Sequence, residues 1–276
     1  MPDNAPQVRY RAEWIAGFEQ RETLVRKTVT TAADINGSSC VFLVADSNSA
    51  TAVTRGLNGL IPSNADNLTQ YTATLVEWHD LRERTRFNIY TSQGDGRRIM
   101  QENSMAVINR KIDDEIITEL NTCTQDTGAA ARASLEMFMH GLTILGNNAV
   151  PLDNNITALI TPAALAYLMQ TKEFASADYV SNKPFSSQQR MFTWAGINFI
   201  VHPNLPGKAT NAEKMFLYHK SAIGHACDLE SVNVAIGYDE KQDLSWARTS
   251  TFMGSQTLQN SGVVVLNHDG SAYASQ

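Results

Sequence analysis

The sequence predicts an α+β fold in which an extended N-terminal third precedes the compact core. Residues 1–98 read as an arm, a turn-rich loop and an alternating strand. A long amphipathic helix follows at 97–121, and the remainder reads as an α/β stretch that ends in a run of strands. A chain that begins with a long arm and loop is typical of a subunit completed by its neighbours, so this order favours assembly over catalysis.

The composition is that of a globular chain without a strong attraction to polyanions. The 276 residues are 43% apolar, and 22 basic against 28 acidic side chains give a net charge of −6. Gripping a phosphate backbone needs clustered Lys and Arg, so this balance argues against such a surface. The three cysteines form no Cys-x-x-Cys pair, which is typical of reduced thiols. We see no signal-peptide pattern and no apolar run near about 18 residues, and we expect a soluble, intracellular chain with no membrane partner.

Residues 9–36 form an arm of balanced charge that carries two aromatic side chains, Trp14 and Phe18. They are four residues apart, so one helical turn would place both on one face. We favour an arm whose aromatic side chains dock on an adjacent subunit. The alternative is a short helix packed on its own domain.

A projecting two-stranded loop is predicted next. Asn36-Gly37 is a turn signal, and residues 38–44 form a strand. Residues 46–67 are too rich in small and polar side chains to pack a core, and a returning strand follows over 71–90. Isolated two-stranded hairpins are only marginally stable in water, so we expect this loop to be supported from outside the subunit.

Arg82, Arg84 and Arg86 alternate with other residues along the predicted returning strand. A period of two places all three on one face. We interpret the row as a contact for carboxylates of an adjacent subunit. The alternative is a solvated edge strand that its charges keep soluble.

Two helices follow the loop. The first, over 97–121, has an apolar stripe at four-residue spacing, formed by Ile108, Ile112, Ile116 and Leu120. The second is predicted from Thr127, a plausible N-cap, to Leu145. The acidic run Asp113-Asp114-Glu115 fans around the first helix, and we expect it on a solvated or intersubunit face.

The second half of the chain predicts strands and one capped helix. Thr161 is an N-cap residue followed by Pro162 at the first helical position, and together they open a helix over 163–174. Strands are predicted at 157–160, 196–201, 215–218, 232–238, 243–252 and 263–267.

The motifs of common enzyme and cofactor sites are missing from the sequence. It holds no Gly-x-Ser-x-Gly, Gly-x-Gly-x-x-Gly, Gly-Lys-Ser/Thr or His-Glu-x-x-His pattern. The nearest approach to a metal set has a spacing that suits no standard zinc site, at His219, His225, Cys227 and Asp228. His202 precedes a proline and is interpreted as a turn residue. We therefore expect no catalytic residue, no cofactor and no metal.

The order of these pieces resembles the major capsid protein of tailed bacteriophages, the Hong Kong 97-type family, over nearly the whole chain. The resemblance is carried by the stretch from Thr161-Pro-Ala-Ala-Leu to Phe174 with 177–180 after it, and by later stretches, 194–206, 216–226, 236–238, Gly254 and 262–265. Each stretch alone is a weak signal. Their order, combined with the arm, the loop and the long helix, is much more specific.

The resemblance implies four parts: an N-terminal arm (1–36), an extended β-hairpin loop (37–92), a peripheral domain with the spine helix (93–155 and 232–276) and an apical domain (156–231). It implies a late structural protein, not an enzyme, that self-assembles as hexamers and pentamers into an icosahedral shell. That shell belongs to the virion, is assembled in the host cytoplasm and encloses double-stranded DNA without sequence-specific binding. The implied partners are a separate scaffolding protein, a portal and, optionally, a decoration protein.

Two features depart from some relatives. The arm starts directly at Met1, so we expect no preceding scaffolding segment, and residues 37–92 contain no lysine for a covalent link between subunits. Three alternatives stay open: an encapsulin-like compartment of the same fold, a soluble α/β enzyme with an unrecognised site, and a phage decoration or tail protein. Particle contents, turnover by an isolated monomer and copy number per virion would distinguish them.

Overall fold

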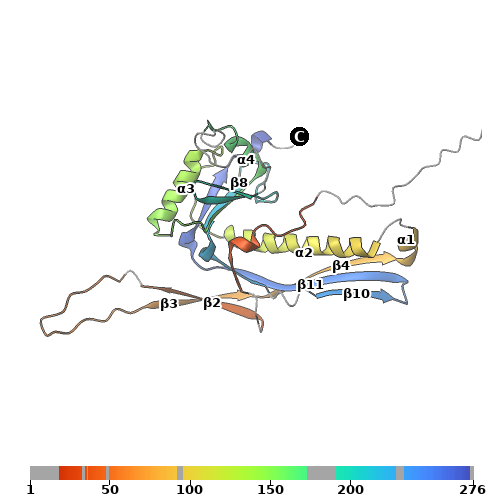
Figure 1. The fold of residues 1–276 in the computed structure, drawn as a ribbon, viewed down its shortest axis with the longest axis horizontal. Helices are drawn as coiled ribbons and strands as arrows, with labels where there is room; N and C mark the ends of the chain where they lie inside the picture. Colours follow the sequence, from red (N-terminus) through yellow and green to blue (C-terminus); the bar gives the residue numbers. More distant parts are fainter. Residues whose placement is uncertain are drawn as a thin grey trace, which may run out of the picture.

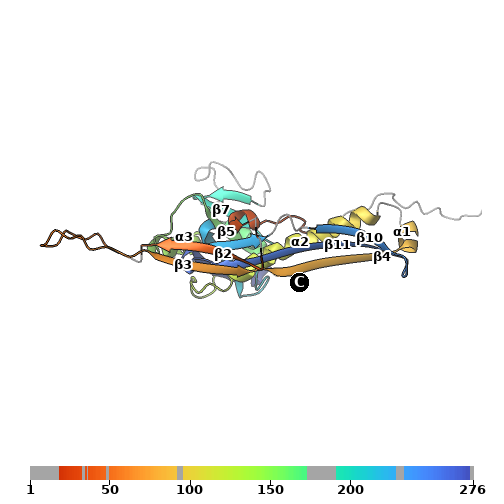
Figure 2. The same ribbon diagram turned by 90° about the horizontal axis from the view of Figure 1, so that it is seen from below.

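The computed structural model describes residues 19–32, 35, 37–47, 50–91, 96–172, 191–227 and 233–273. The molecule is elongated and thin, with a compact lobe above one long layer and a hairpin projecting beyond it (Figures 1 and 2). No helix in the described part is both long and apolar enough to cross a membrane.

The long layer is a five-stranded sheet with one long helix packed on it. Its strands run in the order β1-β9-β11-β10, and β4 pairs with the other side of β11. The bounds are β1 Thr30–Ala32, β4 Val76–Thr85, β9 Ile223–Cys227, β10 Asn233–Asp239 and β11 Leu244–Thr257. The helix α2, Gly96–Leu120, lies along β11 and β4 (Figure 1). Its predicted stripe is confirmed, because Ile108, Ile112, Ile116 and Leu120 are all buried in the core.

The compact lobe contains the second five-stranded sheet, in the order β12-β8-β5-β7-β6. Its strands are β5 Ile156–Ile160, β6 Met191–Trp194, β7 Ile197–Val201, β8 Glu213–His219 and β12 Val263–His268. Two helices pack on it, α3 Leu135–Asn147 and α4 Pro162–Leu168. Thr161 caps α4 as predicted, since its hydroxyl accepts a hydrogen bond from the Ala164 amide. The helix ends earlier than the predicted 174, and residues from 173 lie outside the described residues.

The described residues also form four single-turn 3₁₀ helices: η1 Arg26–Thr28, η2 Lys220–Ala222, η3 Asn260–Gly262 and η4 Ser271–Tyr273. The sheet membership of two strands does not follow the domain boundary expected between residues 231 and 232. β9 precedes that boundary and joins the first sheet, whereas β12 follows it and joins the second. The chain therefore passes between the two sheets several times instead of completing one before starting the other.

The projecting hairpin is shorter than the sequence predicts. Its strands β2 Ser39–Asp46 and β3 Asn67–Thr74 pair antiparallel and form a separate two-stranded sheet. The prediction of one returning strand over 71–90 is wrong, because the strand breaks at Leu75 and β4 then pairs with β11 in the first sheet. Because β4 and β11 lie far apart in the sequence, no local sequence pattern indicates that they pair.

The returning strand also ends earlier than predicted. The hydroxyl of Thr85 accepts a hydrogen bond from the Asn88 amide at 3.2 Å, and this cap starts the helix α1, Arg86–Thr91. Arg86 is thus the first helical residue, and the prediction that it shares a strand face with Arg82 and Arg84 is wrong.

The start of the second helix needs a similar correction. α3 begins after Ser134, whose hydroxyl accepts a hydrogen bond from the Met137 amide, and not after Thr127. The Thr127 amide donates instead to the Val265 carbonyl, and the Thr127 hydroxyl accepts from the Asn267 amide. The segment before α3 is therefore held along β12, because its backbone groups find partners there.

The acidic run on α2 does not lie wholly on a solvated or intersubunit face. Asp113 is fully buried, and its carboxylate accepts hydrogen bonds from the Gln20 side chain at 2.5 Å, the Leu24 amide at 2.9 Å and the Val25 amide at 3.3 Å. On its other side lies the buried His202 ring, with Nε2 3.5 Å from the carboxylate. One carboxylate thus joins the N-terminal segment, the long helix and the loop after β7.

Replacing Asp113 with Ala should lower the free energy of unfolding by about 3 kcal/mol, because two amides and one side-chain donor would stay buried without their acceptor. Chemical denaturation of the purified protein measures the loss. The matched control is Asp114→Ala on the same helix, since among the described residues that carboxylate accepts only a 3.4 Å hydrogen bond from Asn204. Equal stability of the two variants would contradict the assigned role of Asp113.

Candidate assembly surfaces

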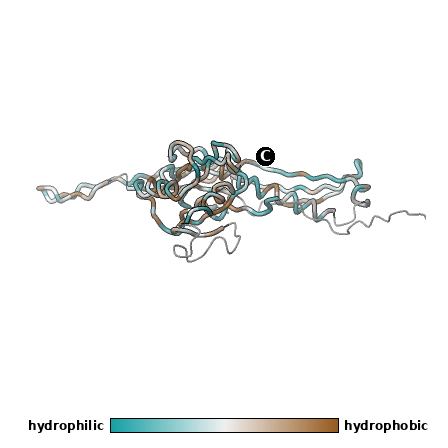
Figure 3. The backbone as a smooth tube through the Cα atoms, turned by 90° about the horizontal axis from the view of Figure 1, so that it is seen from above, coloured by the Kyte–Doolittle hydropathy of each residue, from teal (hydrophilic) through white to brown (hydrophobic). Residues whose placement is uncertain are grey.

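The projecting hairpin exposes apolar side chains along its whole length. On the strands, Val41, Leu43 and Leu68 are 50%, 62% and 61% exposed. At the tip, Leu57, Leu60 and Ile61 are 109%, 75% and 65% exposed, and the hydrophobic tip stands out in Figure 3. Several exposed apolar side chains on one projecting element favour a site of interaction, since burial of each such side chain stabilises a contact by roughly 2 kcal/mol.

The tip of the hairpin has a defined turn but few bonds to hold it. The Gly56 amide donates to the Leu60 carbonyl at 3.0 Å, and the Gly59 amide donates back to Gly56 at 2.9 Å. Gly59 has a φ of 74°, a conformation that favours glycine. The remainder of the tip is linked by single bonds such as that from the Asn64 side chain to the Thr51 carbonyl. A surface so weakly braced from within is suited to packing against a partner.

The base of the hairpin is anchored by two close approaches to glycine. Gly224 of β9 lies beneath the ring of Phe42, and a Cβ at that position would come within 2.9 Å of the ring. Gly254 of β11 lies against the Thr74 carbonyl, which a Cβ would meet at 2.1 Å. Both positions exclude larger residues, so the direction in which the hairpin leaves the body is fixed by packing.

Two of the three arginines of the predicted row share a strand face in the structure, and the third lies on a helix. Arg82 and Arg84 lie on β4, on the face that carries Trp78, and Lys111 of α2 stacks 3.9 Å above the Trp78 ring. Arg82 is paired with Asp80 on the same strand at 2.9 Å. Arg86 lies on α1 close to Tyr238, a residue whose pKa is raised mainly by its hydrogen bond to Asp243. Trp14 and Phe18 lie outside the described residues.

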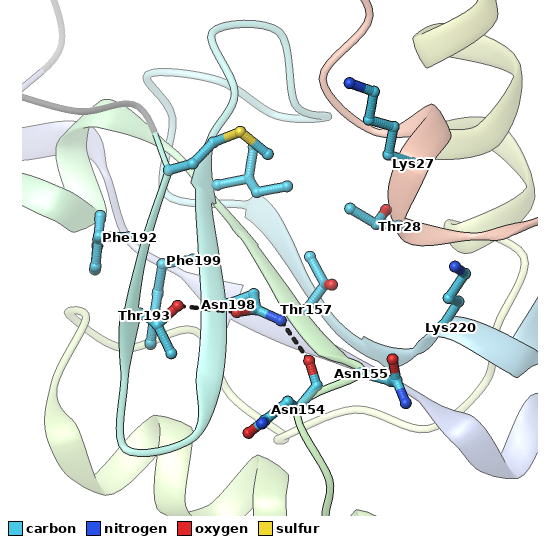
Figure 4. Close-up of a pocket in the computed structure, with 12 residues that line it drawn as sticks. Lys27, Thr28, Asn154, Asn155, Thr157, Phe192, Thr193, Asn198, Phe199 and Lys220 are labelled. Atoms are coloured by element: carbon cyan, nitrogen blue, oxygen red, sulfur yellow. Dashed lines mark hydrogen bonds between the residues drawn. The ribbon is translucent and has the colours of Figure 1, made fainter.

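A cleft of about 330 Å³ separates the N-terminal segment from the second sheet (Figure 4). Lys27 and Lys220 stand at its side, and its floor carries Asn198, whose side chain donates to the Asn154 carbonyl and accepts from the Thr193 hydroxyl. Its described lining contains no carboxylate, histidine or cysteine. This chemistry can bind a polar or acidic group, and the described lining pairs none of its lysines or threonines with an imidazole or carboxylate base.

The histidines that the sequence analysis considered have structural surroundings. His225 is buried in β9, where its Nδ1 lies 2.9 Å from the Ser255 hydroxyl and burial lowers its pKa to about 4. His219 pairs with Asp153 at 3.2 Å, and Asp228 lies outside the described residues. In the described part of the chain, no group of His, Cys, Asp or Glu side chains could hold a metal ion.

His202 is predicted to be a turn residue, and its Nδ1 does accept a hydrogen bond from the Asn204 amide two residues later. Its ring, however, is buried.

Sequence reasoning missed the apolar tip. Small and polar residues dominate 46–67, and Leu57, Leu60 and Ile61 are a few apolar residues among them. Apolar side chains in a segment that cannot build its own core are a signal for an interface, and this signal was present in the sequence. A subunit with an exposed apolar hairpin and open sheet edges belongs to the class of proteins completed by assembly.

Comparisons with known proteins identify the family. A family model described as phage capsid protein matches residues 2–270, so the chain belongs to the phage capsid protein family. It is a major capsid protein that forms the shell. No curated protein sequence matches it.

Solved structures show the fold. One described as Mycobacterium phage Che8 has a TM-score of 0.77 at 14% identity, covering 97% of this chain and 98% of the other. The capsid of the cyanophage P-SCSP1u has a TM-score of 0.73 at 11% identity, covering 94% and 92%. The capsid of Ralstonia phage GP4 has a TM-score of 0.69 at 11% identity, covering 97% and 96%. The predicted α+β fold of the Hong Kong 97 type is confirmed.

Changing Leu57, Leu60 and Ile61 together to Ser should abolish or strongly reduce assembly without affecting the fold. The three side chains are exposed in the single subunit, so their loss costs the subunit nothing, whereas an interface that buries them loses several kcal/mol. Light scattering and electron microscopy measure assembly, and circular dichroism checks the fold. The matched control combines Asn58→Ser and Ser63→Ala on the same tip. Normal shells from the triple variant would show that the tip is not an interface.

Proposed function

We propose that this chain assembles as hexamers and pentamers into the icosahedral shell of a tailed bacteriophage, which encloses double-stranded DNA in the virion. The observation that carries the proposal is the hairpin, whose apolar side chains face solvent in a single subunit. A neighbouring copy is the simplest partner for such a surface, because every copy in a shell offers the same contacts. The proposed role is structural and not enzymatic, as the membership of the phage capsid protein family supports.

We assign the parts of the shell subunit from the sheets. The hairpin of β2 and β3 is the core of the extended loop expected at 37–92. The helix α2 and the first sheet form the peripheral domain, and the second sheet with α3 and α4 forms the apical domain. This assignment differs from the expected bounds, because α3 and β12 move from the peripheral domain (93–155 and 232–276) to the apical domain and β9 moves the other way. The described part of the N-terminal arm includes the segment bound by Asp113, and Arg110 also pairs with Glu19 of that segment at 2.7 Å.

The partners beyond the subunit itself follow from the same assignment. An excess of six acidic charges allows DNA to be enclosed without tight binding, since a strongly basic lining would hold the phosphate backbone. A separate scaffolding protein and a portal complete the assembly in the host cytoplasm, with a decoration protein as an optional addition.

Expression of the chain, with the scaffolding protein if needed, should give closed icosahedral particles in electron micrographs. Particles from infected cells should contain nuclease-protected double-stranded DNA. Because residues 37–92 contain no lysine, boiled particles should run as one band near the 30.4 kDa monomer. Particles filled with a cargo enzyme would favour the encapsulin-like alternative, and a stable monomer that turns over a ligand would favour the enzyme.

We further propose that Arg82, Arg84 and Arg86 contact an adjacent subunit, together with Trp14 and Phe18 of the arm. Changing the three arginines to Glu should reduce shell yield several-fold, because a repulsion of up to about 1 kcal/mol per exposed pair recurs at every contact. Shell yield is measured by sedimentation, with the melting temperature of the subunit as the check on folding. Arg248→Glu, on the opposite face of the same sheet, is the matched control. A normal yield from the triple variant would leave the arginines with a solvated role.

A further inference from the structure

The strand β10 is an edge of the first sheet that nothing in its sequence protects. Among the described residues it pairs only with β11, so its outer backbone groups face away from the sheet at its margin (Figure 1). The opposite edge, β4, carries Glu77, Asp80, Arg82, Glu83 and Arg84. Charges of this kind prevent strands from pairing, whereas β10 reads Asn-Val-Ala-Ile-Gly-Tyr-Asp and has no charge before its last residue.

The side chains of β10 form an apolar row on one face. Val234, Ile236 and Tyr238 are 38%, 50% and 45% exposed. They lie on the same face as Ala247 and Thr249 of β11, which are buried on the side where α2 packs. The helix lies over β11 and β4, which leaves the β10 row uncovered.

The other face of β10 is nearly flat. It carries Ala235 and Gly237, and the indole of Trp246 lies so close over Gly237 that a Cβ there would come within 2.3 Å of it. The strand can therefore accept a neighbouring strand at its open edge without a side chain or bulge that blocks the approach.

We propose that β10 pairs antiparallel with β10 of a second copy across a two-fold axis, with Ile236 opposite the partner's Ile236. This proposal rests on the proposed function, because copies in a shell present the same face outward and a two-fold axis between them is perpendicular to the sheet. Across such an axis, each residue of β10 lies opposite a residue of the partner's β10 whose side chain points to the same face of the joined sheet. Centring on Ile236, the midpoint of Asn233–Asp239, pairs the whole strand.

The register is self-complementary in chemistry as well as in length. Val234 lies opposite the partner's Tyr238, so every pair on the exposed face is apolar with apolar. Asp239 lies opposite the partner's Asn233, and no like charges meet. A shift of two residues in either direction shortens the ladder and places Ile236 opposite Val234 or Tyr238, which leaves apolar side chains at one end unpaired.

The register predicts a specific cross-link. Directly opposite residues in an antiparallel pair have Cα atoms about 4.5–5.5 Å apart, within the range that a disulfide spans. Shells carrying Ile236→Cys, in a background with Cys40→Ser and Cys123→Ser, should give a reducible dimer on oxidation. Ala235→Cys is the matched control, because Ala235 lies opposite the partner's Gly237. Two such cysteines would be about 8 Å apart, too far for a disulfide.

We expect at least about tenfold more dimer from Ile236→Cys than from Ala235→Cys, as the two distances require. Shells that form with equal dimer in both variants would overturn the pairing and leave the proposed function standing. Failure of the unsubstituted protein to form shells would instead contradict the proposed function. If Ile236→Cys alone prevents assembly, mixed shells of Val234→Cys and Tyr238→Cys chains decide, since this register requires a heterodimer from them and its absence overturns the proposal.

Discussion

The buried carboxylate of Asp113 is the interaction on which the arrangement of this subunit depends. Removing a carboxylate from water costs several kcal/mol, and here two backbone amides and the Gln20 amide offset that cost. These donors come from one short N-terminal segment, so the segment is fixed against α2 before it reaches β1. The nearby contact between Thr28 and Tyr218 ties the same segment to the second sheet. The arm, the long helix and the two sheets therefore meet at one place.

The hairpin differs from the body of the subunit because it leaves its apolar side chains exposed. The body of the subunit buries its apolar residues in two clusters, whereas the hairpin carries Leu43 and Leu68 outward on its two strands and Leu57 outward at its tip. A two-stranded sheet is marginal alone, and the close packing of Gly224 and Gly254 at its base sets its direction without burying its length. Folding completes the body, and contacts between copies complete the hairpin.

Local signals explain what the sequence could predict. The Ile stripe of α2, the Thr161-Pro162 helix start and the turn-rich loop are patterns within a few residues, and the structure has all three. The predictions that are wrong concern residues whose partners lie far away in the sequence. Asp113 is buried by residues 88 to 93 positions away, and β4 is set by its pairing with β11. Thr127 and Ser134 are both good N-cap residues, and only the pairing of the earlier segment with β12 decides between them.

The chemistry of the surfaces determines how such a shell can be held together. Without a lysine on the extended loop, that loop cannot supply the amine for an isopeptide bond, so we expect its contacts to be non-covalent. Apolar contacts and strand edges are individually weak, and a single misplaced subunit can dissociate and rebind. Once a closed shell forms, each subunit is held by several neighbours at once, and the effective concentration of each contact is high. Weak contacts therefore allow correction during growth and still give a stable shell, because closure makes them act together.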